Sequence, residues 1–124
     1  MNIKISEFAA QTGFSISTLR YYESLGLLKP SRNPSSQHRE YTEKDLDWVQ
    51  FIKRAKATGM TLSKIQEYSA LRDQGDRTII QRISILVEQE RILRAQIAEL
   101  NGHLDFILQK KHNYYEALQK PQSD

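Results

Sequence analysis

Residues 76–120, DRTIIQRISILVEQERILRAQIAELNGHLDFILQKKHNYYEALQK, decide the fold of this chain. Alternating steps of four and three residues from Ile79 to Tyr114 trace an unbroken seam that is apolar except at Glu90 and Lys111. This spacing is typical of a coiled coil, so it predicts one long helix that pairs with a second copy of the chain. The residues expected in the dimer interface are Ile83, Leu86, Leu93, Ile97, Leu100, Leu104 and Ile107.

The two charged seam positions bear on the direction of the helices. In a parallel pair Glu90 and Lys111 would each face their own copy, with like charges held together. An antiparallel pair brings the acidic part of one helix towards the basic part of the other, so we expect an antiparallel coiled coil. The alternative is that the stripe packs within one chain. Against it, a helix of this length measures roughly 60 Å, and the preceding residues are too few to cover it.

Composition limits the functions that remain. Residues 1–58 hold nine Lys and Arg against six acidic residues, whereas residues 59–124 hold nine of each. A basic N-terminal part on a neutral dimerising helix suits a polyanionic partner. The chain has no cysteine, which excludes disulfides and thiolate metal sites. The histidines do not replace them, because His103 and His112 lie out of phase on one helix and His38 is in a distant loop. We therefore expect no metal and no cofactor.

The first 24 residues show the spacing of a helix-turn-helix. Ser6 and Ser15 are candidate caps for two short helices within about 5–24, and Gly13 separates them. On the second helix Ile16, Leu19 and Tyr22 share one face, which we expect to pack inward. The opposite face carries Ser17, Arg20, Tyr21 and Ser24, side chains that suit the major groove and its phosphates. The alternative is a solvated face on which Arg20 pairs with Glu23 or Glu7.

Residues of about 28–41 predict a hairpin beside these helices. Short strand-like runs at 27–29 and 38–41 bracket a segment of turn-forming residues, so the hairpin is a candidate wing in which Arg32, His38 and Arg39 approach the DNA backbone. A plain surface loop is the alternative. Two further helices follow at about 43–57, opened by a capping box of Thr42 and Asp45, and at about 62–74, capped by Thr61. The resulting domains are 1–75, 76–120 and a tail at 121–124.

Neither a membrane protein nor an enzyme is indicated. No apolar run is long enough to cross a bilayer, and the first seven residues contain no apolar signal core, so a cytoplasmic location is expected. The chain shows no nucleophile paired with a base, no pair of carboxylates in a cleft pattern and no phosphate-binding loop. We therefore expect no catalytic residues.

Several runs together resemble the start of the MerR family of transcriptional regulators. They are Ile5-Ser6-Glu7-Phe8-Ala9, Gly13-Phe14-Ser15, Leu19-Arg20-Tyr21-Tyr22-Glu23, Gly26-Leu27-Leu28-Lys29-Pro30, Arg39-Glu40-Tyr41-Thr42 and Gly59-Met60-Thr61-Leu62. The resemblance covers about the first 75 residues. It implies a mainly α protein, with a winged helix-turn-helix domain and a long dimerisation helix that forms an antiparallel coiled coil.

The same resemblance implies a function. Such a homodimer binds a pseudo-palindromic site in double-stranded promoter DNA and, in response to an effector, distorts that DNA so that RNA polymerase can engage the promoter. It places Arg20 and Tyr21 at the groove and phosphates, Arg39 in the wing and Lys56 on a phosphate. With the hydroxyl and wing residues, the candidate DNA contacts are Ser15, Ser17, Thr18, Arg20, Tyr21, His38, Arg39 and Lys56.

Two departures from the family pattern concern the wing and the effector. The wing motif usually reads Gly-Tyr-Arg, whereas this chain has Gln37-His38-Arg39. The chain looks closest to a short subgroup that responds to aldehydes or nitrosative stress, some members of which carry a cysteine where Arg54 stands, so a thiol switch is excluded here. The sequence does not identify the small-molecule effector. The rival from another functional class is a coiled-coil adaptor whose winged domain binds protein.

Overall fold

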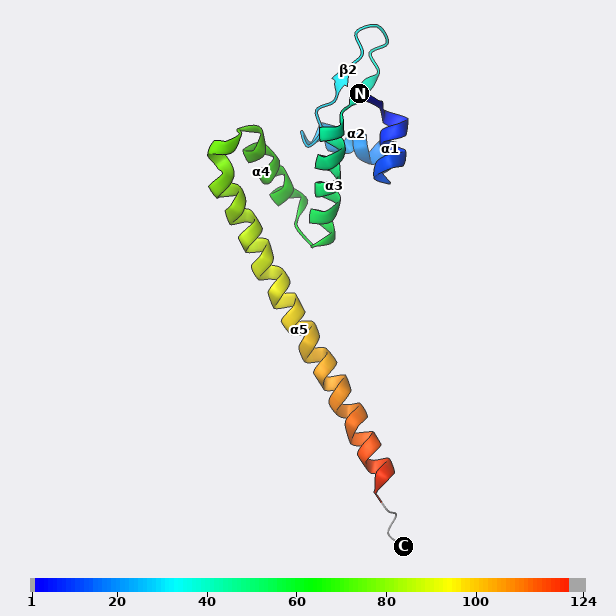
Figure 1. Ribbon diagram of the computed structural model, residues 1–124, viewed down its shortest axis with the longest axis vertical. Helices are drawn as coiled ribbons and strands as arrows, with labels where there is room; N and C mark the ends of the chain where they lie inside the picture. Colours follow the sequence, from blue (N-terminus) through cyan, green and yellow to red (C-terminus); the bar gives the residue numbers. More distant parts are fainter. Residues whose placement is uncertain (1, 121–124) are drawn as a thin grey trace. The chain divides into compact units, whose positions relative to one another are not determined.

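A computed structural model describes residues 2–120 of the chain, so the expected tail at 121–124 lies outside the described residues. The described part is mainly helical, with a small sheet, as Figure 1 shows. Its elements in chain order are β1 (Ile3–Lys4), α1 (Ile5–Thr12), α2 (Ile16–Ser24), β2 (Ser31–Arg32), β3 (Arg39–Tyr41), α3 (Glu43–Ala57), α4 (Leu62–Asp73), the 3₁₀ turn η1 (Asp76–Thr78) and α5 (Ile79–Gln119).

Helices α1 and α2 form the expected helix-turn-helix. Gly13 has a φ of 79°, a left-handed conformation that glycine adopts without steric cost, and its N–H donates to the carbonyl of Ala9. The Ser15 hydroxyl accepts from the N–H of Thr18, which confirms the predicted cap of α2. The Ser6 cap was wrong, because α1 begins at Ile5 and leaves Ser6 inside its first turn.

The hairpin is present, but its strands differ from the prediction. The first strand is Ser31–Arg32, whereas we expected 27–29; Leu27 and Leu28 are instead buried in the core. The strand β3 pairs with β2 on one side and with β1 on the other, and all of these pairs are antiparallel. The two-residue strand β1 therefore anchors the base of the wing to the start of α1, which no sequence pattern had indicated.

The core of the N-terminal part lies where the first three helices, α4 and the sheet meet. The ring of Phe8 stacks on Tyr41 from β3, with centroids 4.1 Å apart. Leu19 of α2, Ile52 of α3 and Ile65 of α4 are fully buried in the same cluster. The capping box of Thr42 and Asp45 and the Thr61 cap hold the starts of α3 and α4, as predicted. The core thus fixes α2 and the wing on one scaffold.

The long helix begins later than expected. Asp76 to Thr78 form a 3₁₀ turn, and α5 runs for 41 residues from Ile79. The chain divides into two compact units, the first ending at Ile85 and the second beginning at Leu86. The first turns of α5 belong to the N-terminal unit because Ile85 is buried in its core. Within residues 2–120, no helix has both the length and the apolar character that crossing a membrane requires.

Candidate nucleic-acid interface

The start of α2 presents three hydroxyl side chains. The Ser15 Oγ lies 3.1 Å from the Ser17 Oγ and donates to the Thr18 Oγ1 at 2.9 Å. Ser15 and Ser17 are exposed, whereas Thr18 is partly buried. A helix N-terminus carries a partial positive charge, and hydroxyls are common phosphate contacts. The predicted hydroxyl residues therefore stand at the end of α2 that suits a phosphate.

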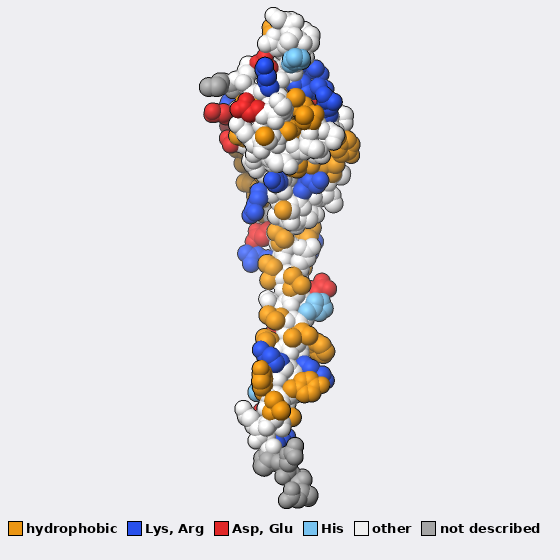
Figure 2. Space-filling view, turned by 90° about the vertical axis from the view of Figure 1, so that its right-hand side faces the viewer, with side chains coloured by type: hydrophobic (Ala, Val, Ile, Leu, Met, Phe, Trp, Pro, Cys, Tyr) orange, Lys and Arg blue, Asp and Glu red, His pale blue; other side chains and the backbone are white. Residues whose placement is uncertain are grey.

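The structure brings Arg20, His38 and Arg39 together around one concavity. These three predicted residues line a cavity of about 380 Å³ together with Lys4 and Ser6. The lining thus combines Lys4 of β1, Arg20 of α2 and Arg39 of β3, with no acidic side chain among its members. Figure 2 shows Lys and Arg side chains gathered along one edge of the N-terminal unit. A basic concavity between helix and wing is suited to a phosphodiester backbone.

Arg39 is held in place by a carboxylate of α2. The Arg39 Nε donates to the Glu23 Oε2 at 2.6 Å, and the Arg32 guanidinium lies 3.7 Å from the other oxygen of the same carboxylate. Both side chains of the closer pair are about three-quarters buried. The ion pair occupies the Nε of Arg39 and fixes the wing against α2.

The Arg20 guanidinium behaves differently. Among the described residues it has neither an acidic partner nor a hydrogen-bond acceptor, so the alternative, in which Arg20 pairs with Glu23 or Glu7, is wrong. Arg20 is exposed on α2, which leaves all of its donors available. An exposed arginine with free donors is able to bind guanine or phosphate.

Two further predicted contacts lie on the same unit. Tyr21 is exposed on 51% of its surface. Lys56 is exposed at the C-terminal end of α3, where its Nζ donates to the Tyr22 hydroxyl at 3.3 Å. Neither lines the basic concavity. Ile16, which we expected to pack inward, is 38% exposed because it occupies the first position of α2.

Tyr41 underlies the wing without contributing to its surface. Its ring is fully buried, and no described residue offers a hydrogen-bond partner to its hydroxyl. Burial raises the pKa of Tyr41 above its ordinary value, and the negative charge of Glu23 raises this pKa further. The side chain is therefore neutral at physiological pH and acts as a packing residue against Phe8.

Sequence reasoning missed Lys4 and Ser6 as members of the basic concavity. Both precede or begin α1, and they reach the wing because Lys4 pairs with Glu40 in the sheet. A two-residue strand has no periodicity that would have indicated this neighbourhood. Within residues 2–120 no group of three or more His, Cys, Asp or Glu residues is arranged to hold a metal ion.

Comparison with known proteins gives a consistent result. Residues 3–71 match the family described as "MerR HTH family regulatory protein", and residues 46–109 match "MerR, DNA binding". The HTH-type transcriptional regulator AdhR of Bacillus subtilis is 38% identical over 91 residues, which cover 73% of this chain and 65% of that protein. An uncharacterized HTH-type transcriptional regulator of Haemophilus influenzae is 34% identical over 117 residues, which cover 94% of this chain and 87% of that protein.

A solved structure agrees with this match. The crystal structure of HiNmlR, described as a MerR family regulator lacking the sensor domain and bound to promoter DNA, superimposes with a TM-score of 0.77 at 34% identity. The superposition covers 94% of this chain and 93% of that chain. With its winged helix-turn-helix, its long helix and these matches, the chain belongs to the MerR family of DNA-binding transcriptional regulators.

Proposed function

We propose that this regulator binds a pseudo-palindromic promoter site as a homodimer, with α2 in the major groove and the wing on the adjacent backbone. The observation that carries the proposal is the basic concavity, in which Arg20 from α2 and Arg39 from the wing line one surface. Arg20 supplies free donors for a base edge or phosphate, and the hydroxyls at the start of α2 supply phosphate contacts. The crystal structure of HiNmlR, which is bound to promoter DNA, supports this assignment.

The seam of α5 supports the homodimer. Six of the seven predicted interface residues have between 42% and 66% of their surface exposed, and Leu93 is partly buried. Figure 2 shows hydrophobic side chains at intervals along the helix. An apolar stripe of this length on a protein surface is normally covered by a partner, and a second copy supplies a matching stripe.

The charges of the seam favour an antiparallel pair of defined register. If Ile97 packs against Leu100 of the partner subunit, the seam overlaps over nearly all of its length. In that register Glu90 lies about one helical turn, roughly 6 Å along the axis, from Lys111 of the partner subunit. These long side chains can then offset each other's charge, whereas a parallel pair would hold like charges together.

The residues beside the seam support the same register. Every seventh residue from position 80 flanks the seam, and this row is apolar at its ends and polar in its middle: Ile80, Val87, Arg94, Asn101, Leu108 and Tyr115. In the antiparallel register Val87 faces Leu108 of the partner subunit and Ile80 faces Tyr115 of the partner subunit, while Arg94 faces Asn101. In a parallel pair this row would face the polar row on the other side of the seam.

Cross-linking tests the dimer directly, because the chain contains no cysteine. A Val87→Cys, Leu108→Cys double variant should be joined into a covalent dimer by a short bismaleimide. The Val87→Cys single variant should remain monomeric on a denaturing gel, because antiparallel copies of this position lie roughly 33 Å apart. Efficient cross-linking of the single variant would mean a parallel dimer and refute the register.

Footprinting tests the DNA-binding function. The protein should protect a palindromic site in the DNA upstream of its own coding sequence, with an affinity that falls steeply as salt rises. Where no upstream site is protected, selection from a random duplex library supplies one. Absence of protection and of selection at low salt would contradict the proposal, and salt-insensitive association with another protein would favour the adaptor.

Three further parts of the proposal follow from family membership. RNA polymerase is the expected partner at the bound promoter, distortion of the promoter DNA is the expected mode of action, and a small effector molecule is the expected signal. We propose no catalytic role, and we expect the protein to act in the cytoplasm.

A further inference from the structure

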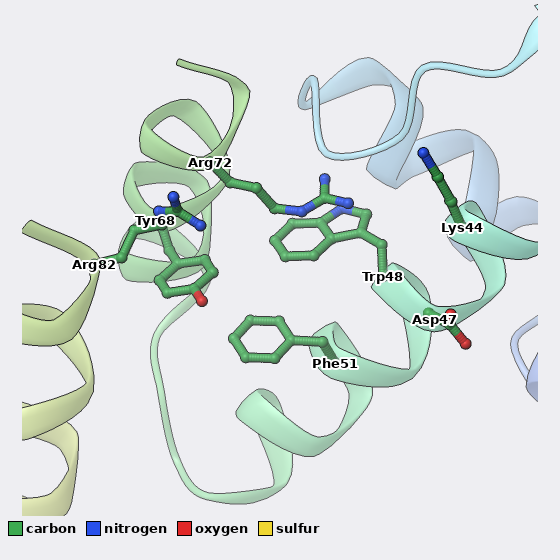
Figure 3. Close-up of a pocket in the computed structure, with 7 residues that line it drawn as sticks. All are labelled: Lys44, Asp47, Trp48, Phe51, Tyr68, Arg72 and Arg82. Carbon is green, nitrogen blue, oxygen red and sulfur yellow. The ribbon is translucent and has the colours of Figure 1, made fainter. Parts of the chain in front are cut away.

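An open groove on the N-terminal unit lies apart from the residues of the basic concavity. It measures about 320 Å³ and is lined by Lys44, Asp47, Trp48, Phe51, Tyr68, Arg72 and Arg82, as Figure 3 shows. These residues come from α3, α4 and the first turns of α5. The volume lies at the lower end of the range for small-molecule sites.

The groove is built around three aromatic rings in near-parallel orientation. The ring centroids of Trp48 and Phe51 lie 5.2 Å apart at an interplanar angle of 11°, and those of Phe51 and Tyr68 lie 4.9 Å apart at 21°. Phe51 and Tyr68 are only partly buried. A planar aromatic ligand is able to stack on the exposed parts of such rings with favourable geometry.

Cationic side chains surround these rings. The guanidinium of Arg72 lies over the Trp48 ring, 4.3 Å from its centroid. Arg82 is anchored by hydrogen bonds from Nε to the Thr78 hydroxyl at 3.2 Å and from a terminal nitrogen to the carbonyl of Gly75 at 3.0 Å. Neither arginine has a carboxylate partner among the described residues.

The charge balance of the groove favours an anion. Lys44 joins the two arginines in the lining, and Asp47 is the single acidic side chain there. In Figure 3 the Asp47 side chain lies on the far side of Trp48 from Tyr68 and Arg82. A carboxylate placed beside the arginines would meet cations whose charge no protein carboxylate offsets.

We propose that this groove binds a small planar aromatic carboxylate, whose ring stacks on the exposed parts of Phe51 and Tyr68 and whose carboxylate pairs with Arg72 and Arg82. Charge complementarity and the aromatic walls both select this class of ligand. A neutral aromatic molecule cannot form the ion pair with the arginines, and a saturated carboxylate cannot stack on the aromatic rings.

One residue of the groove lining, Trp48, and one neighbour of the lining, Asp73, contact the segment that leads to the wing. The Trp48 Nε1 donates to the carbonyl of Leu27 at 2.7 Å, and Lys29 forms an ion pair of 2.7 Å with Asp73 at the end of α4. Leu27 and Lys29 lie between the recognition helix and the wing. A ligand that shifts Trp48 therefore acts on the segment that positions the wing, so the bound anion is an effector; this regulatory part rests on the proposed DNA-binding function.

Trp48 is the only tryptophan of the chain, so its fluorescence reports on the groove. The full-length protein is titrated with 2-naphthoate, with the neutral 2-naphthamide and with cyclohexanecarboxylate, and equilibrium dialysis measures binding independently. We expect saturable quenching of Trp48 by 2-naphthoate and at least tenfold weaker binding of the other two compounds. Equal affinity for the carboxylate and the amide would overturn the proposal.

Variants then locate the site. Arg72→Gln should weaken 2-naphthoate binding about tenfold, since it removes a charge-assisted hydrogen bond. Arg82→Gln should also weaken 2-naphthoate binding. Weaker binding in both variants would show that the effect of Arg72→Gln is not caused by a folding defect of that variant alone. The matched control is Arg54→Gln, an exposed α3 arginine outside the lining, which should bind as the wild type does. Equal binding by all three variants would overturn the site.

A second copy of the chain could instead cover the groove in the dimer. In that case 2-naphthoate would not bind the dimeric protein, which overturns the proposal. Failure of the proposed function is distinguishable, because it appears as a lack of operator binding by the ligand-free protein. Ligand binding without any change in operator affinity or DNA distortion would refute the effector role and leave the binding site standing.

Discussion

Replacement of Arg20 tests the assignment of the DNA-facing surface most directly. Arg20 is exposed, and no described residue engages its guanidinium, so Arg20→Ala removes no contact that supports the fold. We expect the free energy of unfolding to change by less than about 0.5 kcal/mol. Loss of one groove contact should cost about 1–3 kcal/mol of operator binding, which corresponds to about a fivefold to 150-fold lower affinity.

Arg39 provides an informative comparison, because its guanidinium has a role within the fold. Its 2.6 Å ion pair with Glu23 has both side chains about three-quarters buried, so Arg39→Ala should lower the free energy of unfolding by about 1–2 kcal/mol. The loss stays below that of a fully isolated charge because Arg32, 3.7 Å from Glu23, still offsets the carboxylate. Arg39→Ala should therefore weaken both stability and operator binding, whereas Arg20→Ala weakens operator binding alone.

The assay is fluorescence anisotropy with the footprinted operator at fixed salt, alongside urea unfolding at fixed protein concentration. Arg77→Ala is the control, since it removes one positive charge from the η1 turn, outside the basic concavity. It should change the operator affinity by less than about twofold. An Arg20→Ala variant that binds the operator as tightly as the wild type would refute the assignment of α2 to the groove.

Three further changes probe the dimer and the fold. Leu93→Glu together with Leu100→Glu should place like charges in the seam and yield monomers by light scattering, with operator affinity lost; a monomeric variant that still binds tightly would contradict the dimeric architecture. Tyr41→Phe should raise the free energy of unfolding by about 1 kcal/mol, because it removes a buried hydroxyl without a protein partner. The raised pKa of Tyr41 also predicts a pH dependence, because burial stabilises the neutral form of its side chain. The part of the free energy of unfolding that depends on neutral Tyr41 is intact below the unfolded-state pKa and is lost as the pH rises above about 10. The phenylalanine variant should not show this loss. Thr42→Ala should lower the free energy of unfolding by about 1 kcal/mol, since the capping box at the start of α3 loses its Thr42 hydroxyl acceptor; no change would contradict the cap.

Features that depend on neighbouring residues were predictable from the sequence. Gly13 ends α1 and Ser15 caps α2, because a glycine φ and a side-chain cap are decided within a few residues. The capping box of Thr42 and Asp45 is equally local. The heptad spacing of α5 predicted one long helix with an apolar seam, since side-chain direction repeats regularly along a helix.

Pairings between distant segments were decided only by the tertiary structure. Strand β1 forms because Ile3 pairs with Tyr41 of β3, and the sequence of a two-residue strand does not predict a partner 38 positions away. The pairing of Glu23 with Arg39 arises in the same way, since the sequence had suggested only Arg20 as a partner of that carboxylate. Local chemistry therefore determined the helices and their ends, whereas long-range packing decided which charges are neutralised within the fold and which stay free for DNA.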